Sequence, residues 1–367
     1  RVSHRMPILG NMLSETDRAR RWASTMRGET GVGLRHAHEG GANRLGRSAA
    51  PAAGRAAREE WEESMLAPGA TRARGAGRRL VPEEPDAERT CFERDRDRIL
   101  HASAFRRLAG KTQVFVFPDD HQRTRLTHAL EVAQVATAIA RAVGANVTLT
   151  EAIALGHDCG HGPGGHASED AFTPYVDGGY DHAVWGADVV LAPLNLCAET
   201  LDGIRNHSWS RPLPSTPEGE IVSWADRIAY VCHDMEDAVD AGIVTEDMLP
   251  ALVRERCGSR RSRWLDAFIG GVVDGIRDTG TVGMSEHLAE ALAEFRAFNY
   301  DHIYMRPASL AQSDSVIRLL RALVEYHAES MPVSDAVTWV SGMTDRFAFA
   351  EAREKLGWRP EDLPIGI

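Results

Sequence analysis

The sequence predicts an all-α protein that contains one small β-hairpin. Several long segments place apolar residues three and four positions apart, which is the period of an amphipathic helix. By contrast, residues 112–117 alternate β-branched and aromatic side chains and end at Pro118, which is typical of one hairpin strand. A hydrophobic fraction of 43% over 367 residues is that of an ordinary globular protein.

The first 57 residues differ from the rest of the chain. They are rich in Arg, Gly and Ala, show no sustained period, and begin with Arg rather than Met. We therefore expect residues 1–57 to be disordered, or to be a non-native extension translated from upstream of the natural start. We expect residues 58–367 to form one folded domain, because no internal repeat or second linker interrupts them.

The folded part is predicted to be a series of helices. Residues 124–143 carry an apolar stripe that stops at Gly144, and residues 218–242 form a second strong helix with Pro217 in its first turn. Thr148–Glu151 has the pattern of a capping box, which opens a helix that ends in a glycine cluster. Further segments with helical spacing are residues 94–108, 288–298, 309–327 and 334–356.

The bulk composition disfavours several classes of function. A formal net charge of −11 disfavours nonspecific binding to nucleic acid. Five cysteines, odd in number and never in CxxC spacing, argue against a disulfide framework or a cysteine zinc site. No apolar run approaches the ~20 residues that span a bilayer, and the N-terminus has no secretory pattern. We expect a cytoplasmic protein without a membrane partner.

The stretch from Gly156 to His166 is the strongest functional signal in the chain. Adjacent His157 and Asp158 offer one nitrogen and one oxygen, the mixed ligand set of a borderline or hard divalent cation. His161 and His166 follow within the same glycine-rich segment, and glycine lets the backbone turn sharply and approach a ligand closely. Packing alone does not require this composition.

A metal site needs more than two ligands, and the neighbouring helices supply candidates. The predicted helix before the pair carries His128, and the one after it carries Asp226. With His157 and Asp158 they form a set of two nitrogens and two oxygens, which admits Mn, Mg, Fe, Zn, Co or Ni. Taken singly, His128 is also consistent with a core histidine and Asp226 with an ion pair to Arg227.

Eight short motifs stand in a fixed order along the chain. They are residues 94–99 (RDRDRI), 104–108 (AFRRL), 111–115 (KTQVF), 123–128 (RTRLTH), 151–158 (EAIALGHD), 206–208 (NHS), 225–230 (ADRIAY) and 342–347 (GMTDRF). From about residue 58 to the end, the chain resembles the HD superfamily of metal-dependent phosphohydrolases, and more closely the deoxynucleoside triphosphate triphosphohydrolase (dGTPase-like) family. The resemblance implies an HD-domain helical phosphohydrolase fold with additional C-terminal helices.

The resemblance also implies hydrolysis of a deoxynucleoside triphosphate (dNTP) to a deoxynucleoside and tripolyphosphate, by attack of water on the α-phosphorus. The residues implied to line the α-phosphate are His161, His166, Glu169 and His182. His182 or His161 would protonate the leaving 5′-oxygen. Glu169 would orient the water or hold a histidine in its protonated form, and His166 would contact phosphate. A capping or loop role for His182 stays open.

The triphosphate requires cations, and three candidates follow from the sequence. Arg125 lies three residues before His128, so the two share a helix face. Arg227 follows Asp226, and both arginines match family positions that touch phosphate. Lys111, near the predicted hairpin, is the third candidate. Each of these residues is also consistent with an ordinary surface cation.

Sugar recognition is implied along one helix. Asp226, Tyr230 and Asp234 repeat every four residues and therefore share a face. The Tyr230 ring can pack against a deoxyribose where a 2′-hydroxyl would clash, and Asp234 can accept a hydrogen bond from the 3′-hydroxyl. The alternative is a solvated polar stripe.

The family resemblance implies a homo-oligomer and leaves a nucleotide activator as a further partner. Two other functions are alternatives: an HD phosphohydrolase that acts on nucleoside monophosphates or cyclic dinucleotides, and an inactive HD scaffold that binds nucleotide or single-stranded nucleic acid. The accessory residues His161, His166, Glu169 and Tyr230 argue against the first, and the complete ligand set argues against the second.

Two positions depart from the family pattern. Gly164 stands where the family commonly has an aromatic residue, which we expect to loosen the loop that carries His166. Cys159 stands where a branched aliphatic residue is common. A thiolate ligand at Cys159 is disfavoured because the four-ligand set is already complete.

Overall fold

The computed structural model describes residues 15–25, 29–30, 33, 35–38, 54–116, 118 and 121–364. The chain divides into two units, residues 1–52 and 53–367. In the first unit, α1 (Glu15–Thr25) is followed by β1 (Glu29–Thr30) and β2 (Arg35–His36), which pair antiparallel. The predicted disorder of residues 1–57 concerns a segment that lies largely outside the described residues, and it stays a prediction.

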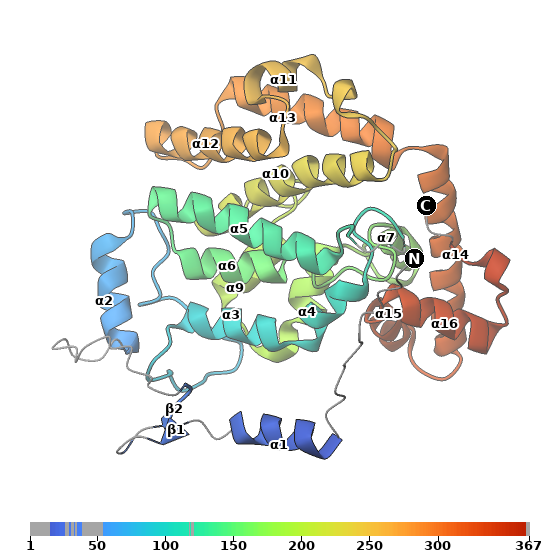
Figure 1. Cartoon of the computed structure of the whole chain (residues 1–367), viewed down its shortest axis with the longest axis horizontal. Coiled ribbons are helices and arrows are strands. Elements are labelled where there is room, and N and C mark those ends of the chain that lie inside the picture. The colour runs from blue at the N-terminus through green and yellow to red at the C-terminus, as the bar shows by residue number, and fades with distance from the viewer. Residues whose placement is uncertain are drawn as a thin grey trace, which may run out of the picture. The chain divides into compact units, whose positions relative to one another are not determined.

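The second unit is all-α, as predicted (Figure 1). Its helices are α2 (Arg55–Met65), α3 (Cys91–His101), α4 (Ser103–Arg107), α5 (Arg125–Val143), α6 (Val147–Gly156), α7 (Ala167–Phe172), α8 (His182–Trp185), α9 (Ala198–Arg205), α10 (Pro217–Asp240), α11 (Ala251–Cys257), α12 (Arg261–Thr279), α13 (Glu286–Asn299), α14 (Pro307–Ala328), α15 (Val333–Ser341) and α16 (Asp345–Leu356). The sequence did not indicate α2, which begins within residues 1–57, nor α7, α8, α9, α11 or α12.

The strongest predicted helices are confirmed. α5 ends at Val143 because Gly144 takes the left-handed conformation, with φ of 75°. α10 has Pro217 in its first turn, and the Thr216 hydroxyl accepts the N–H of Gly219 at 3.1 Å. α6 begins at Val147 rather than Thr148, because the Asn146 side chain caps it.

Two segments predicted as single helices are each broken in two. Residues 94–108 fall in α3 and α4, which Ala102 separates in an extended conformation. Residues 334–356 fall in α15 and α16. α16 restarts because the Thr344 hydroxyl accepts the N–H of Phe347 at 3.4 Å, which caps a new helix.

The hairpin strand predicted for residues 112–117 is reduced to one isolated bridge between Thr112 and Thr124; residue 117 itself lies outside the described residues. The physical reason is that the N–H and hydroxyl of Thr112 donate to Asp345 instead of extending a ladder. The two-stranded hairpin that does form is β1–β2 in the first unit.

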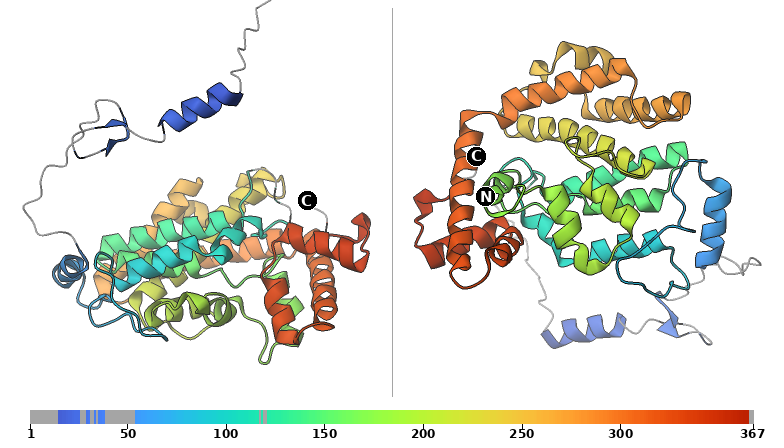
Figure 2. Two further views of the ribbon diagram at one scale, coloured as in Figure 1. Left: turned by 90° about the horizontal axis from the view of Figure 1, so that it is seen from below. Right: turned by 180° about the vertical axis from the view of Figure 1, so that it is seen from behind.

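Among the described residues, buried apolar side chains form two cores. The first core joins α3, α5, α6, α9, α10, α12 and α13. The second core joins α7, α14, α15 and α16. Figure 1 shows α5, α6 and α10 side by side, with α14–α16 at one end of the second unit, and the views in Figure 2 agree.

A buried carboxylate attaches α3 to the start of α9. Asp95 is fully buried and lies 2.7 Å from Arg79 Nη1. It also accepts the N–H of Cys197 at 2.8 Å and the hydroxyl of Thr200 at 2.7 Å. Loss of this carboxylate would leave the Arg79 charge without its buried counter-ion, although two backbone carbonyls still accept from the guanidinium. It would also leave the Cys197 N–H and the Thr200 hydroxyl without this acceptor.

We expect Asp95→Ala to lower the free energy of unfolding by about 3–5 kcal/mol, the usual cost of removing one partner of a buried ion pair. Chemical denaturation measures this change. Asp97→Ala is the matched control on the same helix, because its partners Arg89 and Arg96 are partly exposed, and it should cost about 1 kcal/mol or less. Equal losses in the two variants would contradict the assignment.

Candidate metal centre and substrate pocket

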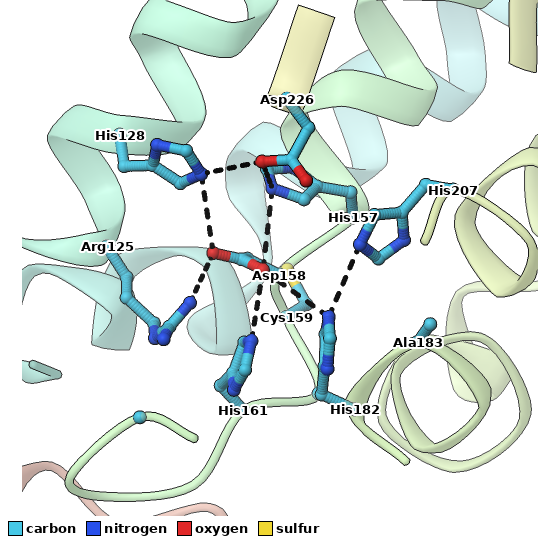
Figure 3. Close-up of polar contacts among 12 residues, drawn as sticks. Arg125, His128, His157, Asp158, Cys159, His161, His182, Ala183, His207 and Asp226 are labelled. Carbon is cyan, nitrogen blue, oxygen red and sulfur yellow. Dashed lines mark hydrogen bonds and ion pairs between the residues drawn. The ribbon is translucent and has the colours of Figure 1, made fainter. Parts of the chain in front are cut away.

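The four predicted metal ligands lie together in the structure (Figure 3). α5 supplies His128, the turn after α6 supplies His157 and Asp158, and α10 supplies Asp226. His128 Nε2 lies 3.1 Å from Asp226 Oδ1 and 3.9 Å from Asp158 Oδ2. His157 Nε2 lies 3.4 Å from Asp158 Oδ1 and 3.7 Å from Asp226 Oδ1.

These atoms suit a divalent cation. Ligands held ~2.1 Å from an ion lie about 3.0 Å apart in octahedral and about 3.4 Å apart in tetrahedral geometry, close to the observed spacings. His157 Nδ1 donates to the carbonyl of Ala154 at 2.7 Å, which leaves the Nε2 lone pair free. That Nε2 is buried without a hydrogen-bond partner. The residues present therefore fit a metal ion.

Arg125 holds Asp158 in its charged form. The Arg125 side chain is almost fully buried, and its Nη1 donates to Asp158 Oδ2 at 2.6 Å. Burial raises the pKa of Asp158, but the neighbouring His157, Arg125 and His161 side chains outweigh it and hold the pKa well below its usual range. Gly165, at φ of 65°, is needed beside this arginine, because an added Cβ would lie 2.8 Å from Arg125 Nη2.

Glycine also explains how the helix α8 reaches the metal centre. A Cβ at Gly160 would lie 2.0 Å from the carbonyl oxygen of His182 and 2.4 Å from the amide nitrogen of Gly186. Only glycine permits this close approach. As a result, the rings of His161 and His182 stack with centroids 3.8 Å apart.

His182 is paired with Glu169. Its Nδ1 and its backbone N–H both donate to Glu169 Oε1, at 2.6 and 2.9 Å. Burial lowers the pKa of His182, but the hydrogen bond and charge of Glu169 outweigh it and raise the pKa above the ordinary histidine value. Burial raises the pKa of Glu169, but the hydrogen bond and charge of His182 outweigh it and lower the pKa of that carboxyl to about 2. The pair favours imidazolium and carboxylate.

Three further histidines of the pocket, His161, His166 and His207, favour the neutral form. Burial and the charge of Arg125 hold the pKa of His161 well below its usual range and lower that of His166 to about 4. Burial and neighbouring histidines lower the pKa of His207 to about 4 as well. Among the rings of His161, His166, His182 and His207, that of His182 is therefore the one suited to carry a proton.

His207 was not predicted as a site residue, although it belongs to the motif NHS. Its Nδ1 donates to the carbonyl of Ile204 at 2.8 Å, so its Nε2 faces His182 Nε2 at 3.3 Å. One ring nitrogen of His207 and one ligand atom each of His157 and Asp158 lie within 4.8 Å of one another, so the three could share a metal ion. No spacing rule links residue 207 to His157 and Asp158, so the motif NHS was the signal in the sequence that could have identified His207.

The centre forms one end of a cavity of about 460 Å³. Arg125, His166 and Arg227 line it, together with Tyr230 and Asp234. The sequence did not indicate further lining residues, among them Gln113, Trp209, Arg296, Tyr300, Tyr304 and Gln312.

Side chains on the far side of the cavity are held in place by aromatic partners. The Arg227 guanidinium lies 3.4 Å from the ring centroid of Trp209. Arg296 Nε donates to the Tyr230 hydroxyl at 2.8 Å. Tyr304 donates its hydroxyl to Asp234 Oδ2 at 2.5 Å, while Asp234 Oδ1 is buried without a hydrogen-bond partner.

Lys111, the third predicted substrate cation, lies apart from these residues. It is buried and is not among the side chains that line the cavity. Its Nζ donates to the carbonyls of His161 and Ser341, the latter at 2.9 Å. Burial lowers the pKa of Lys111 to about 7.

The two departures from the family pattern have different consequences. Gly164 has φ of 73°, and an added Cβ would lie 2.4 Å from Val316 Cγ1, so the loop packs closely on α14. This close packing differs from the looser loop that we expected. Burial raises the pKa of the Cys159 thiol to about 12, which disfavours a thiolate.

One family model and three similar proteins bear on the family. The model of the HD domain family matches residues 125–231. A deoxyguanosinetriphosphate triphosphohydrolase-like protein of Caldanaerobacter subterraneus is 38% identical over 81% of this chain and 94% of its own length. Proteins of the same name from Clostridium perfringens and a Ruegeria species are 39% and 35% identical, over 73% and 77% of this chain and 87% and 97% of their own lengths. Among the described residues, no helix has the length and apolar character to cross a bilayer.

We expect Asp226→Ala to weaken Mn²⁺ binding by about 100-fold or more, because the variant loses one of four ligands. Metal analysis after dialysis and titration calorimetry measure the loss. The control is Asp234→Asn, which changes a residue two turns further along α10 and outside the ligand set. This variant should bind metal like the wild type. Full metal content in Asp226→Ala would contradict the ligand set.

Proposed function

Because the chain belongs to the deoxyguanosinetriphosphate triphosphohydrolase-like family of HD-domain proteins, we propose that it hydrolyses dNTPs to deoxynucleoside and tripolyphosphate. One observation carries the proposal. The proposed metal ligands border a cavity of about 460 Å³, beside His182, whose pKa is raised, and beside the cationic side chains of Arg125 and Arg227.

We assign the phosphate end of the cavity to residues around the centre. His128, His157, Asp158 and Asp226 would hold a divalent cation, which would lower the pKa of a bound water and offset negative charge on the α-phosphate. Arg125 keeps Nε and Nη2 buried without protein hydrogen-bond partners, so both can donate to phosphate oxygens. Arg227 Nε is likewise buried without a hydrogen-bond partner, and this guanidinium is assigned to the more distal phosphates.

We assign the general acid role to His182. Departure of the sugar 5′-oxygen requires a proton, and an imidazolium near neutral pH supplies it. Glu169 accepts a hydrogen bond from His182 Nδ1 and so stabilises the protonated ring. The proton on Nε2 is therefore the one that the ring can transfer. Neutral His166 then acts as a hydrogen-bond donor to phosphate rather than as an acid.

The sugar is assigned to the face of α10 beyond the centre. Tyr230 and Asp234 both line the cavity. The buried Asp234 Oδ1 lacks a partner and can accept from a 3′-hydroxyl. The Tyr230 ring, held by Arg296, occupies space that a ribose 2′-hydroxyl would enter. Selectivity for deoxyribose follows from this arrangement.

The proposed reaction is tested by its products. Purified protein is incubated with each dNTP, alone and in pairs, with Mn²⁺ or Mg²⁺ in H₂¹⁸O. Attack at the α-phosphorus breaks the bond to the 5′-oxygen, so we expect ¹⁸O in tripolyphosphate and none in the deoxynucleoside. Asp226→Ala is the inactive control. Pyrophosphate or orthophosphate as the first product would overturn the proposal.

The acid assignment predicts a pH dependence. The pKa of His182 is raised, so kcat should fall as pH rises through a value above that of ordinary histidine. Glu169→Gln removes the stabilising charge, burial then dominates, and the alkaline limb should move down by about one to two pH units. The matched control is Glu131→Gln, which removes the partner of His233 at 3.0 Å, outside the cavity lining. A limb that stays in place in Glu169→Gln would rule out His182 as the acid.

A further inference from the structure

The loop of residues 161–166 lies between the two cores. It follows α6, whose buried side chains belong to the first core, and it leads into α7, whose buried side chains belong to the second. The loop carries His161 and His166 and packs on Val316 of α14. Its position relative to the metal ligands therefore depends on how the second core is attached to the first.

Asp345 makes a polar attachment at this junction. It is the first residue of α16 and only 4% exposed. Its Oδ2 accepts the N–H of Thr112 at 3.0 Å and the Thr112 hydroxyl at 2.5 Å. Its Oδ1 accepts the N–H of Gly164 at 2.9 Å. One buried carboxylate thus joins α16, the segment before α5, and the histidine loop.

Lys111 provides a second attachment beside the first. Its Nζ donates to the carbonyl of His161, in the loop, and to that of Ser341, at the end of α15. Lys111 therefore holds the loop at His161, while Asp345, which also accepts from Thr112, holds it at Gly164. The motif GMTDRF, which has no part in the proposed chemistry, supplies Asp345.

We propose that Asp345 is a positioning residue for this loop: through Thr112 and Gly164 it fixes His166 and Arg125 relative to the metal ligands. The inference rests on the proposed function. Gly165, next to the anchored Gly164, contacts Arg125, so a shift of the loop changes the phosphate-binding residues directly. The proposed ligands His128 and Asp226 stand on α5 and α10 of the first core and bond to each other, whereas Asp345 bonds to Thr112 and Gly164.

An isosteric change separates this role from simple filling of space. In Asp345→Asn one carboxylate oxygen becomes an NH₂ group, which must face a backbone or hydroxyl donor. Thr112→Val keeps the side-chain shape and removes one donor. The matched control is Glu351→Gln, which lies on the same helix α16 and pairs with His327 away from the loop.

The experiment combines hydrogen–deuterium exchange with steady-state kinetics on the full chain loaded with Mn²⁺. In Asp345→Asn and Thr112→Val we expect faster exchange in peptides covering residues 160–168, and unchanged exchange in α5 and α10. We expect kcat for dNTP hydrolysis to fall by about tenfold to 100-fold, the cost of misplacing reacting groups by about 1 Å. Metal content should stay at the wild-type value, and Glu351→Gln should behave as wild type.

The outcomes are distinct. Unchanged exchange in residues 160–168 overturns the proposal, and so does faster exchange with unchanged kcat. If Asp345→Asn unfolds, the smaller change Thr112→Val decides by the same two criteria. A wild-type protein without dNTP hydrolysis refutes the proposed function, whereas the exchange measurement still decides whether Asp345 holds the loop.

Discussion

The buried carboxylate of Asp158 is the interaction on which the site depends. Its Oδ2 accepts from Arg125 at 2.6 Å, and its Oδ1 lies 3.2 Å from His161 Nε2 and 3.8 Å from His182 Nε2. One side chain is therefore shared by the proposed metal ligands and the proposed phosphate-binding residues. A buried anion is costly unless it is paired, and the surrounding ring of cationic and imidazole groups provides that pairing.

The same constraint accounts for the glycines around it. So many polar side chains converge on one carboxylate only if the backbone segments that carry them approach one another closely. Gly160 allows α8 to lie against the turn, and Gly165 leaves room for the Arg125 guanidinium. The glycine-rich composition is thus a consequence of the number of groups around Asp158, rather than a sign of mobility.

The sequence predicted the helices that carry long apolar stripes, and it placed His128 and Asp226 on two of them. The proposed ligands His128, His157, Asp158 and Asp226 meet because α5, α6 and α10 pack against one another in the first core. Periodicity does not reveal contacts between distant segments, such as Asp345 with Thr112 or Tyr304 with Asp234. Lys111 is another contact that the sequence does not reveal. Its charge suggested that it binds substrate, but its buried side chain hydrogen-bonds the carbonyls of His161 and Ser341 in two other segments.

The presence of two cores means that the site is built from parts that can vary separately. The proposed ligands stand on helices of the first core, whereas α14 of the second core contributes Ser309, Gln312, Ser313 and Val316 to the cavity wall. Substitutions along that face of α14 change what the cavity accepts without altering any of the proposed ligands. Descendants of this chain can therefore diverge in the ligands that the cavity accepts while they inherit the same proposed metal ligands.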